Sequence, residues 1–284
     1  MTVLLQVSDP HFGTEDASVV VALERLTTEL RPDVLLLSGD ITQRATRAQF
    51  AAARAFVDRL GVPACVAIPG NHDIPLFDVV ARSLRPYARY AAAFGDDLEP
   101  RFENGDALVL GVNTTRWYRH QDGAVSAAQI ERVATQLSSA TRTQWRIVVV
   151  HQPLAVTLTK DLKNLARGHE AALRRWREAG ADLVVGGHIH LPYVLQLPGP
   201  AQTNGKAEPR TLWVAQAGTA ISRRVRPEAG NSVNVIRVEA TPRRAVIERW
   251  DHDAAARRFA RVGSHALASA IAPTDAAKDE GVGS

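Results

Sequence analysis

Short apolar runs alternate with segments of helical periodicity through the first two thirds of the chain. Apolar runs of about four to eight residues between Gly, Pro or polar residues are typical of buried strands, whereas apolar residues three and four apart mark a helix face. The pattern predicts strands at residues 3–7, 34–38, 62–68, 107–112, 146–150 and 182–186. It predicts helices near residues 16–30, 46–60, 126–138 and 169–179, with Ser126 as an N-cap. Residues 76–94 form a further helix or loop, broken at Pro86.

The pattern changes after His190. Further strands are predicted at residues 192–197, 211–215, 232–238 and 245–250, with turn-rich connections and no helix between them. Strand–helix alternation followed by a series of strands indicates two sheets packed face to face, with helices outside. The predicted fold class is therefore α/β.

Composition sets the size of this fold. The chain has 284 residues, 45% of them hydrophobic, which is enough for a full core in one large domain. We expect this domain to span residues 1–263 and a flexible tail, rich in Ala, Gly, Ser, Asp and Lys, to span residues 264–284. No stretch approaches the roughly 20 apolar residues of a transmembrane segment.

The amino terminus and the cysteine content suggest a compartment. The first residues enter the first strand without a basic leader. Cys65 is the only cysteine, which excludes an internal disulfide, and its place in an apolar run predicts a buried thiol. We therefore expect a cytoplasmic protein.

The net charge is +4, from 34 basic and 30 acidic residues, which is too mild to indicate a nucleic-acid polymer as partner. Arginines cluster at residues 174–177, 223–226 and 257–261. We expect the first and third clusters to lie on solvated helix faces or in the tail.

Five blocks of Asp, Asn and His side chains follow predicted strands. They are Asp9-Pro10-His11, Gly39-Asp40, Gly70-Asn71-His72-Asp73, His151 and Gly187-His188-Ile189-His190. A parallel α/β sheet collects the carboxyl ends of its strands at one edge, so these side chains are expected to meet. Their hard oxygens and borderline nitrogens suit Mn, Fe or Zn. A kink at Pro10 would bring both Asp9 and His11 onto one metal ion.

The order of these blocks resembles the calcineurin-like metallophosphoesterase superfamily over residues 3–250, and in particular its bacterial class III cyclic-nucleotide phosphodiesterase branch. The resemblance implies a four-layer αββα sandwich, two mixed β-sheets flanked by helices. It implies two metal ions, Mn or Fe with Zn possible. The ligands implied for the first ion are Asp9, His11, Asp40 and His190. Those implied for the second are Asp40, Asn71, His151 and His188, so that Asp40 bridges the pair.

The resemblance also implies the chemistry. A pair of such ions lowers the pKa of a bridging water, and the resulting hydroxide attacks phosphorus. His72 would protonate the leaving group or stabilise the transition state, and Asp73 would orient its ring. The alternative for His72 is a structural role beside Asn71.

Substrate contacts are harder to place. Arg44 follows Asp40 closely, and a guanidinium suits phosphate, but a solvated arginine at a helix start is equally expected. Residues 218–223, ending in Arg223, are either a second contact or a turn before a strand. Residues 153–168 and 198–210 are either substrate-facing loops or surface segments.

Several functions fit this pattern. The first is phosphodiester hydrolysis of a small nucleotide such as 3′,5′-cyclic AMP. The alternative is a pyrophosphate hydrolase for a UDP-linked lipid or sugar, similar to UDP-2,3-diacylglucosamine hydrolases, for which residues 153–168 would form a small cap. A metal-free binding scaffold is disfavoured because no ligand is substituted, and a nuclease would need a further DNA-binding region. The expected partner is a small phosphoester, and both a monomer and a homodimer are compatible with the sequence.

Overall fold

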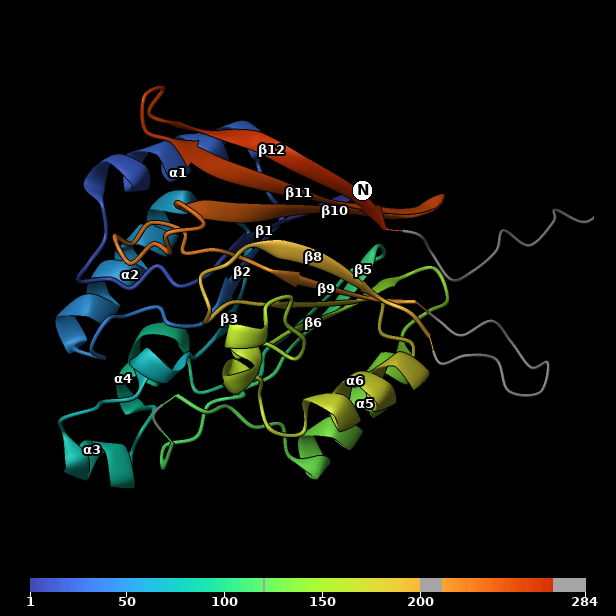
Figure 1. Cartoon of the computed structure of the whole chain (residues 1–284), viewed down its shortest axis with the longest axis horizontal. Coiled ribbons are helices and arrows are strands. Elements are labelled where there is room, and N and C mark those ends of the chain that lie inside the picture. Colours follow the sequence, from blue (N-terminus) through green and yellow to red (C-terminus); the bar gives the residue numbers. More distant parts are fainter. Residues whose placement is uncertain (120, 200–210, 268–284) are drawn as a thin grey trace, which may run out of the picture.

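The computed structural model describes residues 1–119, 121–199 and 211–267, which form two six-stranded sheets packed face to face (Figure 1). The first sheet has the spatial order β12 (Arg258–Leu267), β11 (Arg243–Asp253), β10 (Ser232–Ala240), β1 (Thr2–Val7), β2 (Val34–Ser38) and β3 (Ala64–Ile68). The second has the order β4 (Arg101–Glu103), β5 (Ala107–Gly111), β6 (Trp145–Val149), β7 (Leu183–Gly186), β9 (Leu212–Gln216) and β8 (Tyr193–Leu197).

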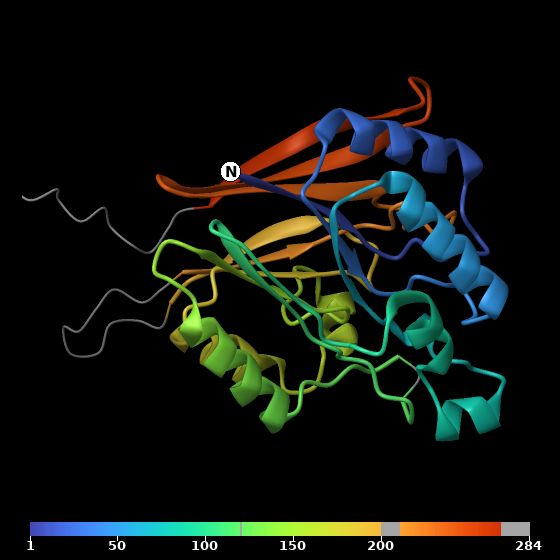
Figure 2. The same cartoon turned by 180° about the vertical axis from the view of Figure 1, so that it is seen from behind.

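Helices cover the outer face of each sheet. The first sheet carries α1 (Ala17–Leu30), α2 (Arg47–Leu60) and α4 (Ala88–Phe94), and the second carries α5 (Ala127–Ser139) and α6 (His169–Glu178). The view from behind shows the two groups of helices on opposite sides of the paired sheets (Figure 2). The four-layer αββα architecture is confirmed.

The core has three parts because both faces of the inner strands are buried. In β1, Leu4 packs between the sheets, whereas Leu5 packs under α1 and α2. Successive strand residues point to opposite faces, so burial on both sides requires a continuous apolar run. This is the physical reason why the strands were visible as uninterrupted apolar segments in the sequence.

The predicted elements all appear, with ends shifted by one or a few residues. Ser126 caps α5, since its hydroxyl accepts a hydrogen bond from the amide of Gln129 at 3.2 Å. Pro86 separates α4 from α3 (Val79–Leu84). In the described part of the chain, no helix follows α6, as predicted. No helix of the described ranges has the length and apolar character needed to cross a bilayer.

Some expectations were wrong. The arginine cluster at residues 257–261 lies on the hairpin into β12, not on a helix or in a tail. Because β12 runs to Leu267, residues 264–267 belong to the first sheet; residues 268–284 of the expected tail lie outside the described residues. Cys65 is exposed rather than buried, because it lies near the start of β3, an edge strand with only one neighbour.

Strand direction places the site. β1, β2 and β3 are mutually parallel, as are β5, β6, β7 and β9. The carboxyl ends of the donor-bearing strands therefore meet at one edge of the sandwich.

Candidate metal centre

The loops after the strands are bonded to one another, both within and between the sheets. The amide of Asp9 donates to the carbonyl of Gly39 at 3.1 Å, so the loops after β1 and β2 run side by side. The amide of His188, after β7 of the other sheet, donates to Asp9 Oδ2 at 3.0 Å. The amide of His72 donates to Asp40 Oδ1 at 2.8 Å. Blocks far apart in sequence are thereby locked into one cluster.

Several donor residues adopt a left-handed backbone conformation that residues other than glycine rarely adopt. They are Asp9 (φ 49°), His11 (φ 45°), Asp40 (φ 48°), His188 (φ 72°) and His190 (φ 54°). Each costs on the order of 1–3 kcal/mol and persists only where the surrounding structure imposes it. Positive φ on both sides of Pro10 produces the kink expected there. Strain of this kind concentrates where side-chain direction matters to function.

Glycines in the blocks allow the loops to approach closely. A Cβ atom on Gly70 would lie 2.0 Å from the backbone nitrogen of Asp40. A Cβ atom on Gly187 would lie 1.9 Å from Ser8 Oγ and 2.4 Å from Asp9 Oδ2. The absence of a side chain at Gly70 and Gly187 therefore lets these loops approach Asp40 and Asp9.

One buried triad consists of Asp9, His11 and His190, with one donor atom of each within 4.8 Å of the others. His11 Nε2 and His190 Nε2 lie 3.1 Å apart, and His190 Nε2 lies 3.2 Å from Asp9 Oδ1. Asp40 Oδ2 is 3.7 Å from His11 Nε2. The Asp40 carboxylate thus lies beside this triad.

The second triad consists of Asp40, His151 and His188. His151 Nε2 lies 3.3 Å from Asp40 Oδ1 and 3.2 Å from Asn71 Oδ1. The two oxygens of Asp40 therefore face different triads. The structure brings all seven predicted ligands together, with Asp40 between the two groups.

Backbone carbonyls orient two of the rings. His151 Nδ1 donates to the carbonyl of Ser38 at 2.9 Å, and His190 Nδ1 donates to that of Arg224 at 2.6 Å. This arrangement directs Nε2 of each ring into the cluster. Burial opposes the imidazolium of His151, but the charge of Asp40 outweighs it and raises the pKa of His151 to about 9. A cation bound here would therefore displace a proton.

The pKa shifts of three other donors, His11, His188 and Asp9, favour the forms that bind a metal. Burial lowers the pKa of His11 to about 3 and that of His188 to about 4, which keeps both imidazoles neutral. Burial alone would raise the pKa of Asp9, but the charge and hydrogen bond of the neighbouring His190 outweigh the effect of burial and hold this pKa at about 2. The carboxylate is therefore ionised at neutral pH.

A metal ion fits these residues on independent grounds. The Nδ1 atom of His188 is buried, and no residue of the described chain forms a hydrogen bond with it. A buried polar atom in this state costs free energy that a metal–nitrogen bond would offset. The mixed donor set of carboxylate, amide and imidazole suits Mn, Fe or Zn.

His72 and Asp73 are supported differently from what was expected. His72 Nδ1 donates to the carbonyl of Gln43 at 3.0 Å, which orients the half-buried ring. The Asp73 carboxylate accepts hydrogen bonds from the amides of Ile41, Thr42 and Gly70 at 2.8–3.0 Å. Asp73 therefore fastens the loops after β2 and β3 together. Burial, then the charge of Asp40, raises the pKa of Asp73 to about 6.

The two arginines proposed from sequence contact side chains outside the two triads. The Arg44 guanidinium is stacked on Phe77, 5.3 Å from the ring centroid. Arg223 is 72% exposed and pairs with Asp16 at 3.8 Å. Arg224, which sequence reasoning passed over, is the arginine of its cluster that reaches the donors. Adjacent side chains on an extended segment point to opposite sides, and the sequence cannot say which side faces the site.

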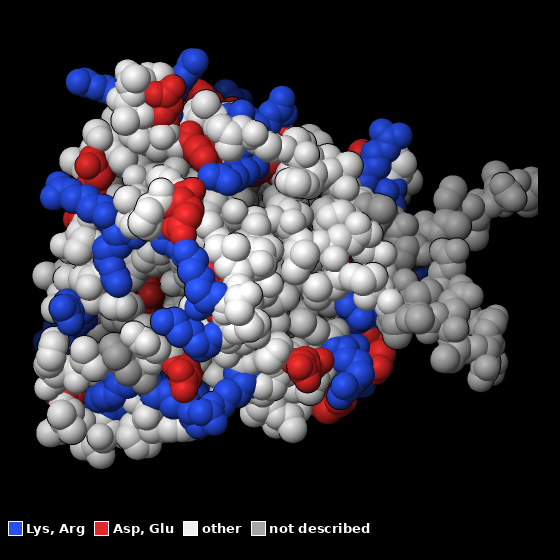
Figure 3. All heavy atoms as spheres, in the orientation of Figure 1, with Lys and Arg blue, Asp and Glu red and all other residues white. Residues whose placement is uncertain are grey.

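The loops expected to face the substrate are partly described. Residues 153–168 contain a 3-10 turn, η2 (Thr159–Asn164), and are tied to the β9–β10 connection by Arg226, whose Nη1 lies 3.1 Å from the Asp161 carboxylate. Of the segment 198–210, residues 200–210 lie outside the described residues. In the space-filling view, basic side chains surround a small hollow with acidic atoms in its depth, on the side where the strand-end loops gather (Figure 3).

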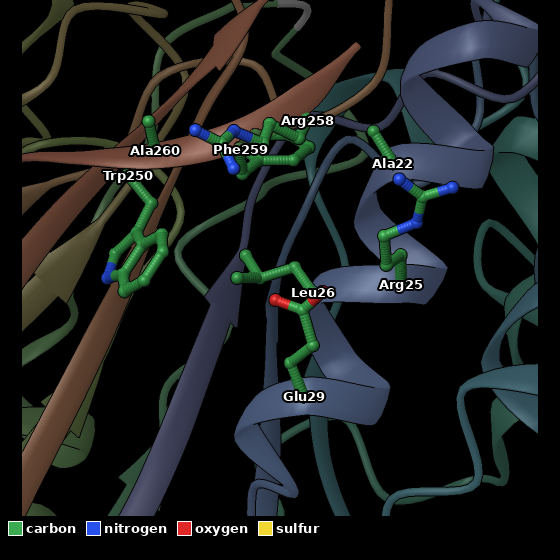
Figure 4. A pocket seen from close by; sticks show the side chains of 8 residues that line it. All are labelled: Ala22, Arg25, Leu26, Glu29, Trp250, Arg258, Phe259 and Ala260. Atoms are coloured by element: carbon green, nitrogen blue, oxygen red, sulfur yellow. The ribbon is translucent and has the colours of Figure 1, made fainter. Parts of the chain in front are cut away.

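A separate groove lies away from the donors. It has a volume of about 340 Å³ between α1 and the β11–β12 hairpin, with Arg25 on one side and Trp250 and Arg258 on the other (Figure 4). It shares no residue with either triad. The site is therefore identified by its donor chemistry and not by the depth of a cavity.

Comparison with known proteins gives a consistent picture. A family model described as calcineurin-like phosphoesterase matches residues 2–192. A probable cyclic nucleotide phosphodiesterase of Synechococcus sp. is 28% identical over 166 residues, which cover 57% of this chain and 60% of that protein. A cAMP/cGMP dual specificity phosphodiesterase of Mycobacterium tuberculosis is 26% identical over 203 residues, which cover 66% of this chain and 61% of that protein. The matches thus span about three fifths of these relatives.

Among solved structures, a dimetal phosphatase from Danio rerio superimposes with a TM-score of 0.63 at 14% identity, covering 94% of this chain and 99% of that one. At this identity the likeness establishes the fold alone.

Proposed function

We propose a phosphodiesterase activity for this chain, which belongs to the calcineurin-like phosphoesterase family. The observation that carries the proposal is the position of Asp40, which belongs to one donor triad through Oδ1 and faces the other through Oδ2. Two cations bound there would supply Lewis acidity and an activated water, the chemistry of two-metal phosphoester hydrolysis.

The residues divide between two cation sites. Asp9, His11 and His190 would hold one ion, and Asn71, His151 and His188 the other, with Asp40 common to both. Mn or Fe is our preferred pair, with Zn also compatible with this donor set.

His72 would act on the leaving group. The Gln43 carbonyl holds Nδ1, so Nε2 is the atom presented outward. A protonated Nε2 would donate to the leaving alkoxide, whereas a ring that only donates a hydrogen bond would stabilise charge. These two roles differ in their dependence on the leaving group, and this difference is tested below.

A small cyclic nucleotide is the proposed substrate class. Both curated relatives are described as cyclic nucleotide phosphodiesterases, which supports a diester over a monoester. A UDP-linked pyrophosphate would favour an apolar cap near the site. Within residues 153–168, Leu154 lies in the core, so only Leu158 and Leu162 are large apolar side chains exposed for such a cap.

A substrate panel tests the proposal. Protein loaded with Mn would be assayed on 3′,5′-cyclic AMP, bis-p-nitrophenyl phosphate, p-nitrophenyl phosphate and a UDP-linked pyrophosphate. We expect the diesters to give the higher kcat/KM and Asp40→Ala to be inactive. A preference for the monoester would reject the phosphodiesterase assignment. Inactivity on every substrate at full metal occupancy would reject hydrolysis itself.

A further inference from the structure

Arg224 extends from the β9–β10 connection across the donor cluster. Its Nη1 atom lies 3.2 Å from His72 Nε2, 3.0 Å from Gln43 Oε1 and 3.4 Å from His11 Nδ1. One guanidinium therefore contacts the ring proposed to face the leaving group and a ring of the first triad. The side chain is otherwise exposed, so a ligand entering the cluster can reach it.

The backbone that carries Arg224 is held by the site itself. Its carbonyl accepts from His190 Nδ1 at 2.6 Å, and its amide donates to Ser222 Oγ at 3.0 Å. In the same connection, Thr219 Oγ1 donates to the carbonyl of Asp9 at 2.6 Å. The contacts with His190 and Asp9 join the β9–β10 connection to the first triad. The backbone position of Arg224 is therefore set by bonds to two of the donor residues, His190 and Asp9.

The chemistry of this position favours an anion. A guanidinium has five N–H donors in a planar fork, and its hydrogen bonds to phosphoryl oxygens are stronger than those to neutral acceptors. The contacts of Arg224 Nη1 with the two imidazole rings and with the Gln43 amide oxygen are hydrogen bonds to neutral acceptors, which are weaker. A phosphate held among these residues would offer Arg224 an oxygen carrying negative charge.

We infer that Arg224 binds a non-bridging oxygen of the substrate phosphate beside His72, and so orients the phosphoryl group for attack. This inference rests on the proposed phosphoesterase function and adds the residue that recognises the anion. Arg223 provides a matched control, because the same residue type in the next position is directed to Asp16 at the surface.

The first test measures binding without turnover. Calorimetry with orthophosphate would be run on Mn-loaded wild type, Arg224→Gln and Arg223→Gln, with metal content measured for each. Loss of one charge-assisted contact should weaken phosphate binding about 10- to 100-fold in Arg224→Gln, and Arg223→Gln should stay within about twofold of wild type. Equal affinity in the two variants would overturn the inference. So would loss of bound metal in Arg224→Gln, which would place the arginine in support of the triad.

The second test uses turnover and chemical rescue. Arg224→Ala should lose about 10- to 100-fold in kcat/KM on bis-p-nitrophenyl phosphate, and Arg224→Lys less, since the charge remains but the fork is lost. Added guanidinium chloride should restore part of the activity of Arg224→Ala, whereas sodium chloride at equal ionic strength should not. Equal effects of the two salts would contradict direct contact with the phosphate. If wild type is inactive, the proposed function fails, and the calorimetric comparison still decides the role of Arg224.

Discussion

Replacing Gly187 with alanine would test how tightly the donor loops are packed. The added Cβ would lie 1.9 Å from Ser8 Oγ, and such atoms essentially never approach closer than 3.0 Å, so a shift of at least 1.1 Å (3.0 − 1.9) is required. Ser8 and Asp9 are fully buried, and Ser8 Oγ donates to Asp9 Oδ2 at 2.5 Å. The strain therefore falls on a donor of the first triad.

Overpacking of this kind costs about 1–3 kcal/mol. For a chain of this size, a loss of about 2 kcal/mol lowers Tm by about 4–8 °C. Asp9 Oδ2 would lie 2.4 Å from the added Cβ and must move by about 0.6 Å (3.0 − 2.4), which should weaken the first cation site. Because Gly187 directly precedes His188, we expect the second cation site to weaken as well. Thermal unfolding of metal-free protein and Mn titration of the folded protein would measure the two effects separately.

Gly105→Ala is the control, because a Cβ there meets no atom within 4 Å and its φ is not in the left-handed region. We expect its Tm and its Mn binding to match those of wild type. If Gly187→Ala also matched wild type in both measurements, the close approach of the loops would not be a constraint on the site, and the reasoning from packing would be refuted.

Three further predictions concern the cluster and its support. Asp40→Ala should lower the Mn stoichiometry below two per chain, because the second triad loses a donor and the first loses the carboxylate oxygen that faces it; metal analysis after desalting that still finds two ions would reject the shared position. His72→Ala should keep its metal and lose about 10²–10⁴-fold on cyclic AMP, if that is a substrate, but far less on bis-p-nitrophenyl phosphate, whose leaving group needs no proton; equal losses would indicate charge stabilisation instead of proton donation. Arg226→Gln leaves the buried Asp161 carboxylate without its 3.1 Å ion pair and should lower the free energy of unfolding in urea by about 1–3 kcal/mol, and an unchanged midpoint would show that the pair contributes nothing.

Most of the fold could be read from the sequence because its inner strands are buried on both faces. Residues 34–37, for example, form an uninterrupted apolar segment for that reason, and the block that contains Asp40 follows it. The two strands that the sequence did not reveal lack this signal. β4 has three residues, and most of β12 is exposed, so neither presents an apolar run.

The candidate donors could also be selected from the sequence, since residue type, order and position after a strand pick out the side chains that the structure brings together. The hydrogen bonds that hold the loops of these residues in place could not be predicted from the sequence. Whether Asp73 faces His72 or fastens neighbouring loops depends on hydrogen bonds to backbone amides some thirty positions away in the chain. Such bonds exist only once the loops have come together, and no local pattern encodes them.

The choice between Arg223 and Arg224 shows the same limit most directly. The two residues are identical and adjacent, so composition, charge and propensity assign them equal roles. Only the path of the β9–β10 connection, set by its bonds to Asp9 and His190, turns one guanidinium toward the donors and the other toward Asp16. The sequence determined which chemistry gathers at this edge of the sheets, and the tertiary structure decided which cation faces it, because side-chain direction on a connecting segment is set by long-range contacts.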